Sequence, residues 1–125
     1  MNALQMARTA YSSAAAPIRT PRDTEYGAFM RVTRQLKAAS EQQTKDYGAF
    51  VRALYDNRKL WTILAKDVAG SDNGLSQDLR AQIFYLAEFT QQHSSKVLGK
   101  TATVDALIEI NTAVMRGLQQ NEVAA

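Results

Sequence analysis

DYGAFVRALYDNRKLWTILAKDV, residues 46–68, is the stretch that decides the fold, and it holds Trp61, the only tryptophan of the chain. Its apolar residues recur at helical spacing, which predicts an amphipathic helix over 45–69. Between Leu60 and Ala65 apolar residues lie on almost every side of this helix, a pattern typical of helices that are covered on several sides. We therefore expect this helix at the centre of the protein, with Trp61 in the core.

Three further stretches combine a helix start signal, apolar residues at helical spacing and a stop signal. The expected starts are Pro21 at a first helical position and the capping residues Ser76 and Thr101 or Thr103; the expected ends lie near Gln42, at Gly99 and near Leu118. The sequence thus predicts an all-α fold, a small bundle of four main helices.

The predicted domain organisation is a single bundle domain over 21–120 between two short ends. Residues 1–20 are rich in Ala, Ser and Arg and form a short N-terminal arm, helical or disordered, and residues 121–125 form a frayed tail. Two interpretations of the arm remain open: a frayed terminus, or a segment that becomes ordered on a partner.

Composition excludes several classes of function. The chain has 125 residues, no cysteine and one histidine, so we expect no disulfide, no metal site and no thiol nucleophile. No apolar run reaches the ~20 residues that a membrane helix needs. There is no phosphate-binding loop and no catalytic triad order. We therefore expect no enzyme activity, no catalytic residue and no cofactor.

Charge is unevenly distributed along the chain. Residues 1–37 hold six basic and two acidic residues, a balance of 6 − 2 = +4, whereas the remainder holds nine basic and ten acidic residues, hence −1. A local basic excess suits an acidic protein surface or a polyanion. RNA is therefore one partner class to test.

Four polar residues interrupt or border the apolar stripes and are candidates for one structural network: Asn57, Arg58, His93 and Asn111. A buried Asn must find hydrogen-bond partners and often fixes how helices align. Two interpretations of Arg58 remain open. Its aliphatic part covers apolar surface while its guanidinium reaches solvent or a carboxylate, or the guanidinium forms a specific buried pair. For His93 the prediction is a hydrogen-bonded packing role.

Several large apolar residues lie off the predicted stripes and are candidates for binding a partner: Leu60, Ile63, Phe84, Tyr85 and Ile110. A surplus of apolar helix surface is typical of partner sites. An amphipathic helix lying in a groove is one partner that suits such a surface.

The chain resembles the flagellar biosynthesis regulator FlaF family from about Ala10 to Leu118. The residues that carry the resemblance are PRDTEY at 21–26, VTRQL at 32–36, DNRKLW at 56–61, LRAQI at 79–83 and LIEIN at 107–111. The resemblance implies a small helical cytoplasmic protein of flagellated bacteria, with flagellin and the regulator FlbT as partners.

The function implied by this resemblance is that of a flagellin-binding, chaperone-like regulator that couples flagellin synthesis to its secretion during flagellum assembly. Two alternatives stay open. One is a post-transcriptional regulator that acts on flagellin messenger RNA, directly or with FlbT, and the other is a helical scaffold that self-associates. The sequence leaves the oligomeric state open.

Overall fold

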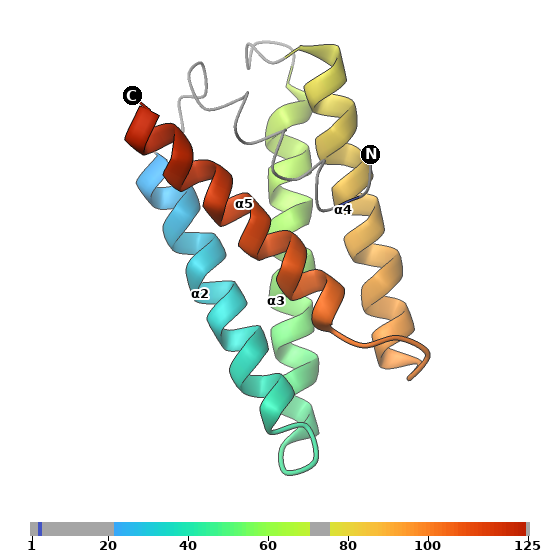
Figure 1. Cartoon of the computed structure of the whole chain (residues 1–125). Coiled ribbons are helices and arrows are strands. Elements are labelled where there is room, and N and C mark those ends of the chain that lie inside the picture. Colours follow the sequence, from blue (N-terminus) through green and yellow to red (C-terminus); the bar gives the residue numbers. More distant parts are fainter. Residues whose placement is uncertain (1–2, 4–21, 71–75, 125) are drawn as a thin grey trace.

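The computed structural model describes residue 3, residues 22–70 and residues 76–124 of the chain. These residues form four α-helices and no strand: α2 (Arg22–Glu41), α3 (Tyr47–Ala69), α4 (Gln77–Leu98) and α5 (Asp105–Ala124) (Figure 1). The predicted all-α bundle is confirmed. Apart from Ala3, which packs against the core, the predicted arm over 1–20 lies outside the described residues.

The central position predicted for α3 is confirmed. The helix begins where the Asp46 carboxylate accepts a hydrogen bond from the Ala49 N–H at 3.0 Å, because a capping side chain satisfies one of the free N–H groups of the first turn. α3 then packs against both α2 and α4, while α5 packs mainly against α2 and crosses in front of α3 (Figure 1). α3 is therefore covered on several sides.

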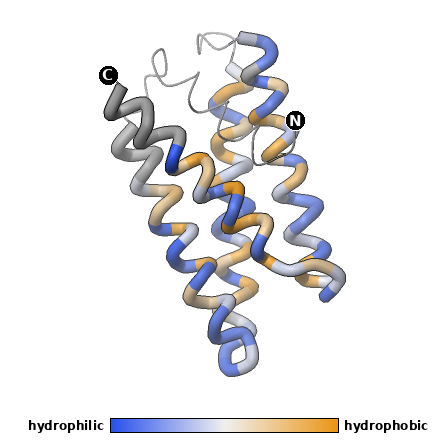
Figure 2. The backbone as a smooth tube through the Cα atoms, in the orientation of Figure 1, coloured by the Kyte–Doolittle hydropathy of each residue, from blue (hydrophilic) through white to orange (hydrophobic). Residues whose placement is uncertain are grey.

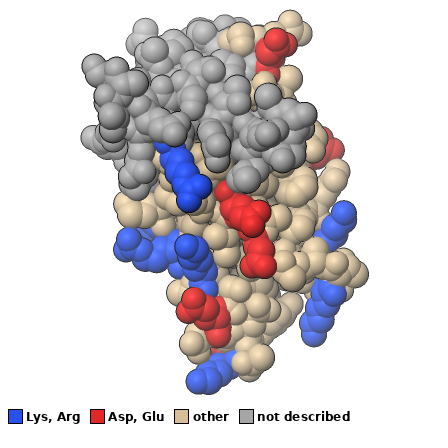
Figure 3. Space-filling view, viewed as in Figure 1, with Lys and Arg blue, Asp and Glu red and all other residues tan. Residues whose placement is uncertain are grey.

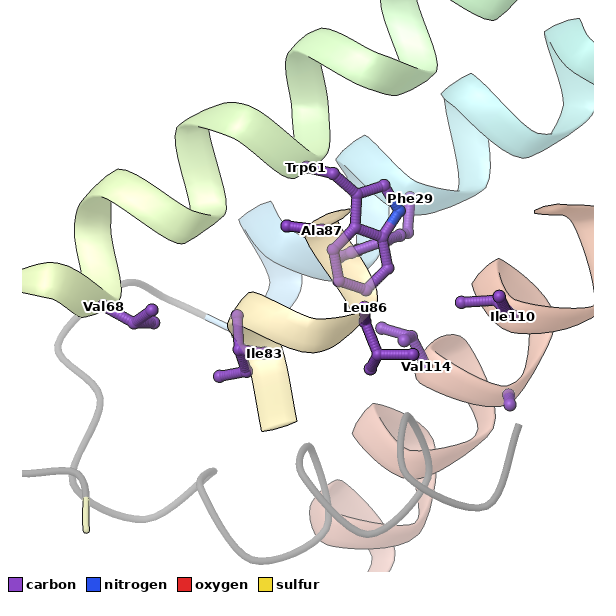
Figure 4. Packing of buried hydrophobic residues seen from close by; sticks show 9 residues of the cluster. Phe29, Trp61, Val68, Ile83, Leu86, Ala87, Ile110 and Val114 are labelled. Carbon is purple, nitrogen blue, oxygen red and sulfur yellow. The ribbon is translucent and has the colours of Figure 1, made fainter. Parts of the chain in front are cut away.

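The core consists of two apolar clusters. Hydrophobic segments alternate with hydrophilic ones along every helix, as amphipathic helices require (Figure 2). The Trp61 cluster comprises Phe29, Trp61, Val68, Ile83, Leu86, Ala87, Ile110, Ala113 and Val114 (Figure 4). The Phe50 cluster comprises Leu36, Ala39, Phe50, Ala53, Leu54, Val97, Val104 and Leu107. Trp61 is 0% exposed, and its ring meets that of Phe29 edge to face at 5.6 Å, so the expected core position of the tryptophan is confirmed.

A layer of buried polar side chains runs across the core, with at least one member from each helix. Its members are Thr33, Asn57, Thr90, Ser94 and Asn111. On α2, α3 and α4 these residues fall in sequence between the members of the Trp61 cluster and those of the Phe50 cluster. Because buried polar groups are costly without partners, this layer is where the stability of the bundle is most sensitive to single polar atoms.

Thr33 gives a direct test of that cost. Its side chain is 3% exposed, and its hydroxyl has no hydrogen-bond partner. Thr33→Val keeps the shape and removes the unsatisfied group, so we expect the free energy of unfolding to rise by about 1 kcal/mol, measured by urea denaturation. Ser94→Ala is the opposite control, because the Ser94 hydroxyl donates to the Thr90 carbonyl at 2.6 Å. A loss of stability in Thr33→Val would contradict the assignment.

The connection between α4 and α5 differs from the sequence prediction. α4 ends at Leu98, next to the predicted Gly99, but Lys100 is the residue with positive φ, at 63°. Neither predicted threonine cap is seen: the Thr101 hydroxyl donates to the Lys96 carbonyl at 3.2 Å, which satisfies the end of α4 instead. α5 also continues to Ala124, beyond the predicted end near Leu118 and into the predicted frayed tail.

Lys100→Gly is expected to stabilise the bundle. A non-glycine residue in the left-handed region costs roughly 1–2 kcal/mol, and the greater backbone entropy of glycine offsets roughly 0.5–1 kcal/mol of the relief. The expected gain in free energy of unfolding is therefore about 0.5–1 kcal/mol, measured by urea denaturation. Lys100→Ala is the matched control, because alanine keeps the Cβ that is strained in the left-handed region and gains no such relief; an equal gain in both variants would contradict this account of the turn.

Candidate partner-binding site

A groove on the surface between α3 and α4 is the candidate site. It has a volume of about 430 Å³. Its floor is made of small side chains, Ala65 and Ala69 from α3 and Ala87 from α4. Ala65 and Ala69 are four residues apart and so lie on one face of α3. Small residues at such positions let another helix approach closely, and ridges of its side chains fit grooves of this kind.

The two walls of the groove carry different side chains. Lys66 of α3 and Glu88 of α4 line it from opposite helices, and both are exposed. Phe84 lines the end of the groove that lies near Ala69, with 40% of its surface exposed. The site therefore combines an apolar floor and an exposed aromatic ring with charges on its walls, and an apolar centre with a polar rim is the layout of a surface that binds a partner chain.

At the other end of the groove a chain of polar contacts crosses from α3 to α4. The Arg58 guanidinium donates through Nε to the Gln91 side-chain carbonyl at 2.8 Å. The Gln91 amide donates to the Thr62 hydroxyl at 3.0 Å, and that hydroxyl donates to the Arg58 carbonyl at 2.9 Å. Arg58 is half-buried and pairs with a neutral amide rather than a carboxylate. These contacts join α3 to α4 at a fixed distance and hold the groove in shape.

The predicted single network of Asn57, Arg58, His93 and Asn111 is wrong, because only the two asparagines meet. The Trp61 indole N–H donates to Asn111 Oδ1 at 3.0 Å, and Asn111 Nδ2 donates to Asn57 Oδ1 at 2.7 Å. An indole nitrogen only donates, so it fixes the orientation of the Asn111 amide and, through it, that of Asn57. The contacts connect α3 to α5 through the core, while Arg58 lies at the groove.

His93 occupies a third, separate place. Its Nε2 lies 2.7 Å from the Thr103 carbonyl oxygen, which can only accept, so Nε2 carries a proton. Its ring stacks on Phe89 with centroids 5.3 Å apart. The histidine thus ties α4 to the segment that leads into α5, in a hydrogen-bonded packing position.

The five residues predicted to bind a partner do not form one surface, and Ile110 is wrong as an exposed residue. Ile110 is 3% exposed and belongs to the Trp61 cluster, because α5 buries a face wide enough to include it. Leu60 is half-buried against the same cluster. Of the five, Phe84 alone lines the groove.

Ile63 and Tyr85 are exposed, by 48% and 49%, but on other sides of their helices. Ile63 follows Asp56 by seven residues and shares its face, and Asp56 accepts a hydrogen bond from Gln35 of α2. Tyr85 precedes Phe89 by four residues and so lies on the His93 side of α4. Neither residue lines the groove, so both serve as controls for it.

The floor and walls of the groove were not predicted from the sequence. The predicted binding residues were large apolar residues off the stripes, whereas the groove is made by small ones, Ala65, Ala69 and Ala87. The signal that was present is the pair of alanines four residues apart on α3. The pattern of a single helix does not show which face of α4 these two alanines meet.

The described part of the chain offers no group of three or more His, Cys, Asp or Glu side chains arranged to hold a metal ion. Among the described residues, none of the helices has the length and apolar character needed to cross a membrane.

Comparison with known proteins gives a match to a protein family. A family model described as flagellar protein FlaF matches residues 7–118, starting three residues before the predicted start of the resemblance at Ala10. Searches of curated proteins and of solved structures find no match. Since the match covers most of the 125 residues, the chain belongs to the flagellar protein FlaF family.

Proposed function

We propose that this flagellar protein is a chaperone-like regulator that binds flagellin in the cytoplasm and couples flagellin synthesis to secretion. Family membership places the chain in the flagellar system, and the groove between α3 and α4 supports binding to a helix. The single observation that carries the proposal is an exposed Phe84 beside a floor of alanines. An amphipathic helix of flagellin buries its apolar face there.

Helix binding in this groove has a simple physical basis. Two helices that pack side by side leave a furrow, and the side chains of a third helix interdigitate with it at an interaxial distance of roughly 8–10 Å. Burial of the exposed part of the Phe84 ring supplies hydrophobic free energy. A secretion substrate held by one such helix is released without unfolding the bundle, because the core residues under the groove stay packed.

Isothermal titration calorimetry with purified flagellin and the full chain tests the proposal. We expect saturable binding with a negative heat-capacity change, the signature of apolar burial. Absence of binding at concentrations where both proteins are monomeric would contradict it. Light scattering on the free protein identifies self-association, the outcome expected of a scaffold.

A role on flagellin messenger RNA, directly or with FlbT, is the second candidate, because basic side chains gather over α2 (Figure 3). Arg31, Arg34 and Lys37 are all exposed on that helix. Three phosphate contacts on a single strand predict that log K falls with log salt at a slope of about −2. An affinity for RNA that is independent of salt would contradict direct phosphate binding.

A further inference from the structure

The groove is electrostatically different on its two sides. Its α3 wall carries Lys66, and Lys59 lies seven residues earlier on the same exposed face of α3. Its α4 wall carries Glu88, whose carboxylate accepts a hydrogen bond from the Gln92 amide, one turn along the helix, at 3.3 Å. The groove therefore presents cations along one side and a carboxylate along the other.

This polarity restricts how a helix lies in the groove. A helix whose apolar face points into a groove exchanges its two flanks when its direction is reversed. Acidic residues on one flank face Lys59 and Lys66 in one direction, and face Glu88 in the other. Like charges brought together across an interface are unfavourable, so charge placement fixes register and orientation.

We propose that the groove binds an amphipathic helix in one direction only, with an acidic flank along the α3 wall and a basic flank along the α4 wall. This inference rests on the proposed function and specifies the flagellin segment that enters the site. From Thr62 to Ala69 the groove follows α3 for about 10 Å, at 1.5 Å per residue. The segment therefore has about two helical turns in contact.

Two synthetic helical peptides of about 18 residues, long enough to hold a helix, test the direction. They share one composition and one apolar stripe; the segregated peptide carries Glu on one flank and Lys on the other, and the control peptide mixes both on each flank. The full chain and the variant K59E/K66E, which has carboxylates on both walls, are titrated with each peptide and with flagellin. We expect the wild-type chain to prefer the segregated peptide by about five- to ten-fold and the variant to lose that preference, since exposed charge pairs act modestly but add along a wall. A photoreactive group at the N-terminus of the segregated peptide should crosslink to one end of the groove only.

Salt provides a further readout, because exposed charges are screened at 1 M, where the Debye length is about 3 Å. The preference should shrink toward equality there while the apolar part of the binding remains. Circular dichroism of the variant checks that its substitutions, all on exposed residues, leave the bundle folded.

The outcomes separate this inference from the proposed function. Equal affinity for the two peptides, or no binding of either, overturns the directional groove, and flagellin binding in that case leaves the proposed function standing. A preference for the segregated peptide that is lost in the variant, without any flagellin binding, supports the directional groove and contradicts flagellin as its occupant.

Discussion

Asn111→Ala is expected to lower the free energy of unfolding by about 3 kcal/mol. The substitution removes the partner of two buried groups, the Trp61 indole N–H and Asn57 Oδ1. A buried donor or acceptor without a partner costs about 1–3 kcal/mol, and both residues are 0% exposed. Urea denaturation followed by tryptophan fluorescence measures the loss, and an unchanged m-value shows that the two-state transition is preserved.

Asn57→Ala is the matched control, and it should cost less. It leaves the hydrogen bond between Trp61 and Asn111 in place and leaves only Asn111 Nδ2 without its partner. Asn57 Nδ2 already lacks a partner, so its removal relieves one unsatisfied group. The double variant should lose less than the sum of the two single losses, because the residues share one bond. Equal losses of stability in the two single variants, with a loss in the double variant equal to their sum, would contradict the chain of hydrogen bonds from the Trp61 indole to Asn57.

Phe84→Ala is expected to weaken flagellin binding about 30-fold without changing stability. An aromatic anchor that is buried by a partner typically contributes 2 kcal/mol or more, and 1.4 kcal/mol corresponds to a factor of ten in Kd. Phe84 is 40% exposed and is not a core residue, so the bundle folds without it. Calorimetry with flagellin measures the change in Kd.

Tyr85→Ala is the matched control for Phe84→Ala. Tyr85 is the next residue, is similarly exposed at 49% and lies outside the groove. We expect its substitution to change Kd by less than two-fold, well under the free energy of one buried aromatic anchor. A larger effect from Tyr85→Ala than from Phe84→Ala would move the binding surface to the His93 side of α4.

Much of the fold was predictable from sequence because its determinants are local. The sequence signals, which are Pro21, the glycines after Ala69 and the apolar spacing around Trp61, each span only a few residues, so helix number and approximate bounds follow from them. The connection at Lys100 was not predictable in detail, because a non-glycine residue in the left-handed region departs from the usual preference.

The site was less predictable because it depends on how helices face each other. Ile110 lies off the predicted stripe of α5, yet it is buried because α5 packs across the core as well as along α2. Arg58 shares its face with Trp61 in the sequence pattern, but its actual partner, Gln91, comes from the facing helix. Pairwise contacts between helices decide both cases.

The central claim is that the groove between α3 and α4 is where flagellin binds, and site-specific photo-crosslinking tests it most directly. The chain has no cysteine, so one introduced cysteine carries the photoreactive group at a single position. We predict a flagellin crosslink from a probe at 84 and none from probes at 63 or 85. Crosslinks from 63 or 85 with none from 84 would contradict the claim.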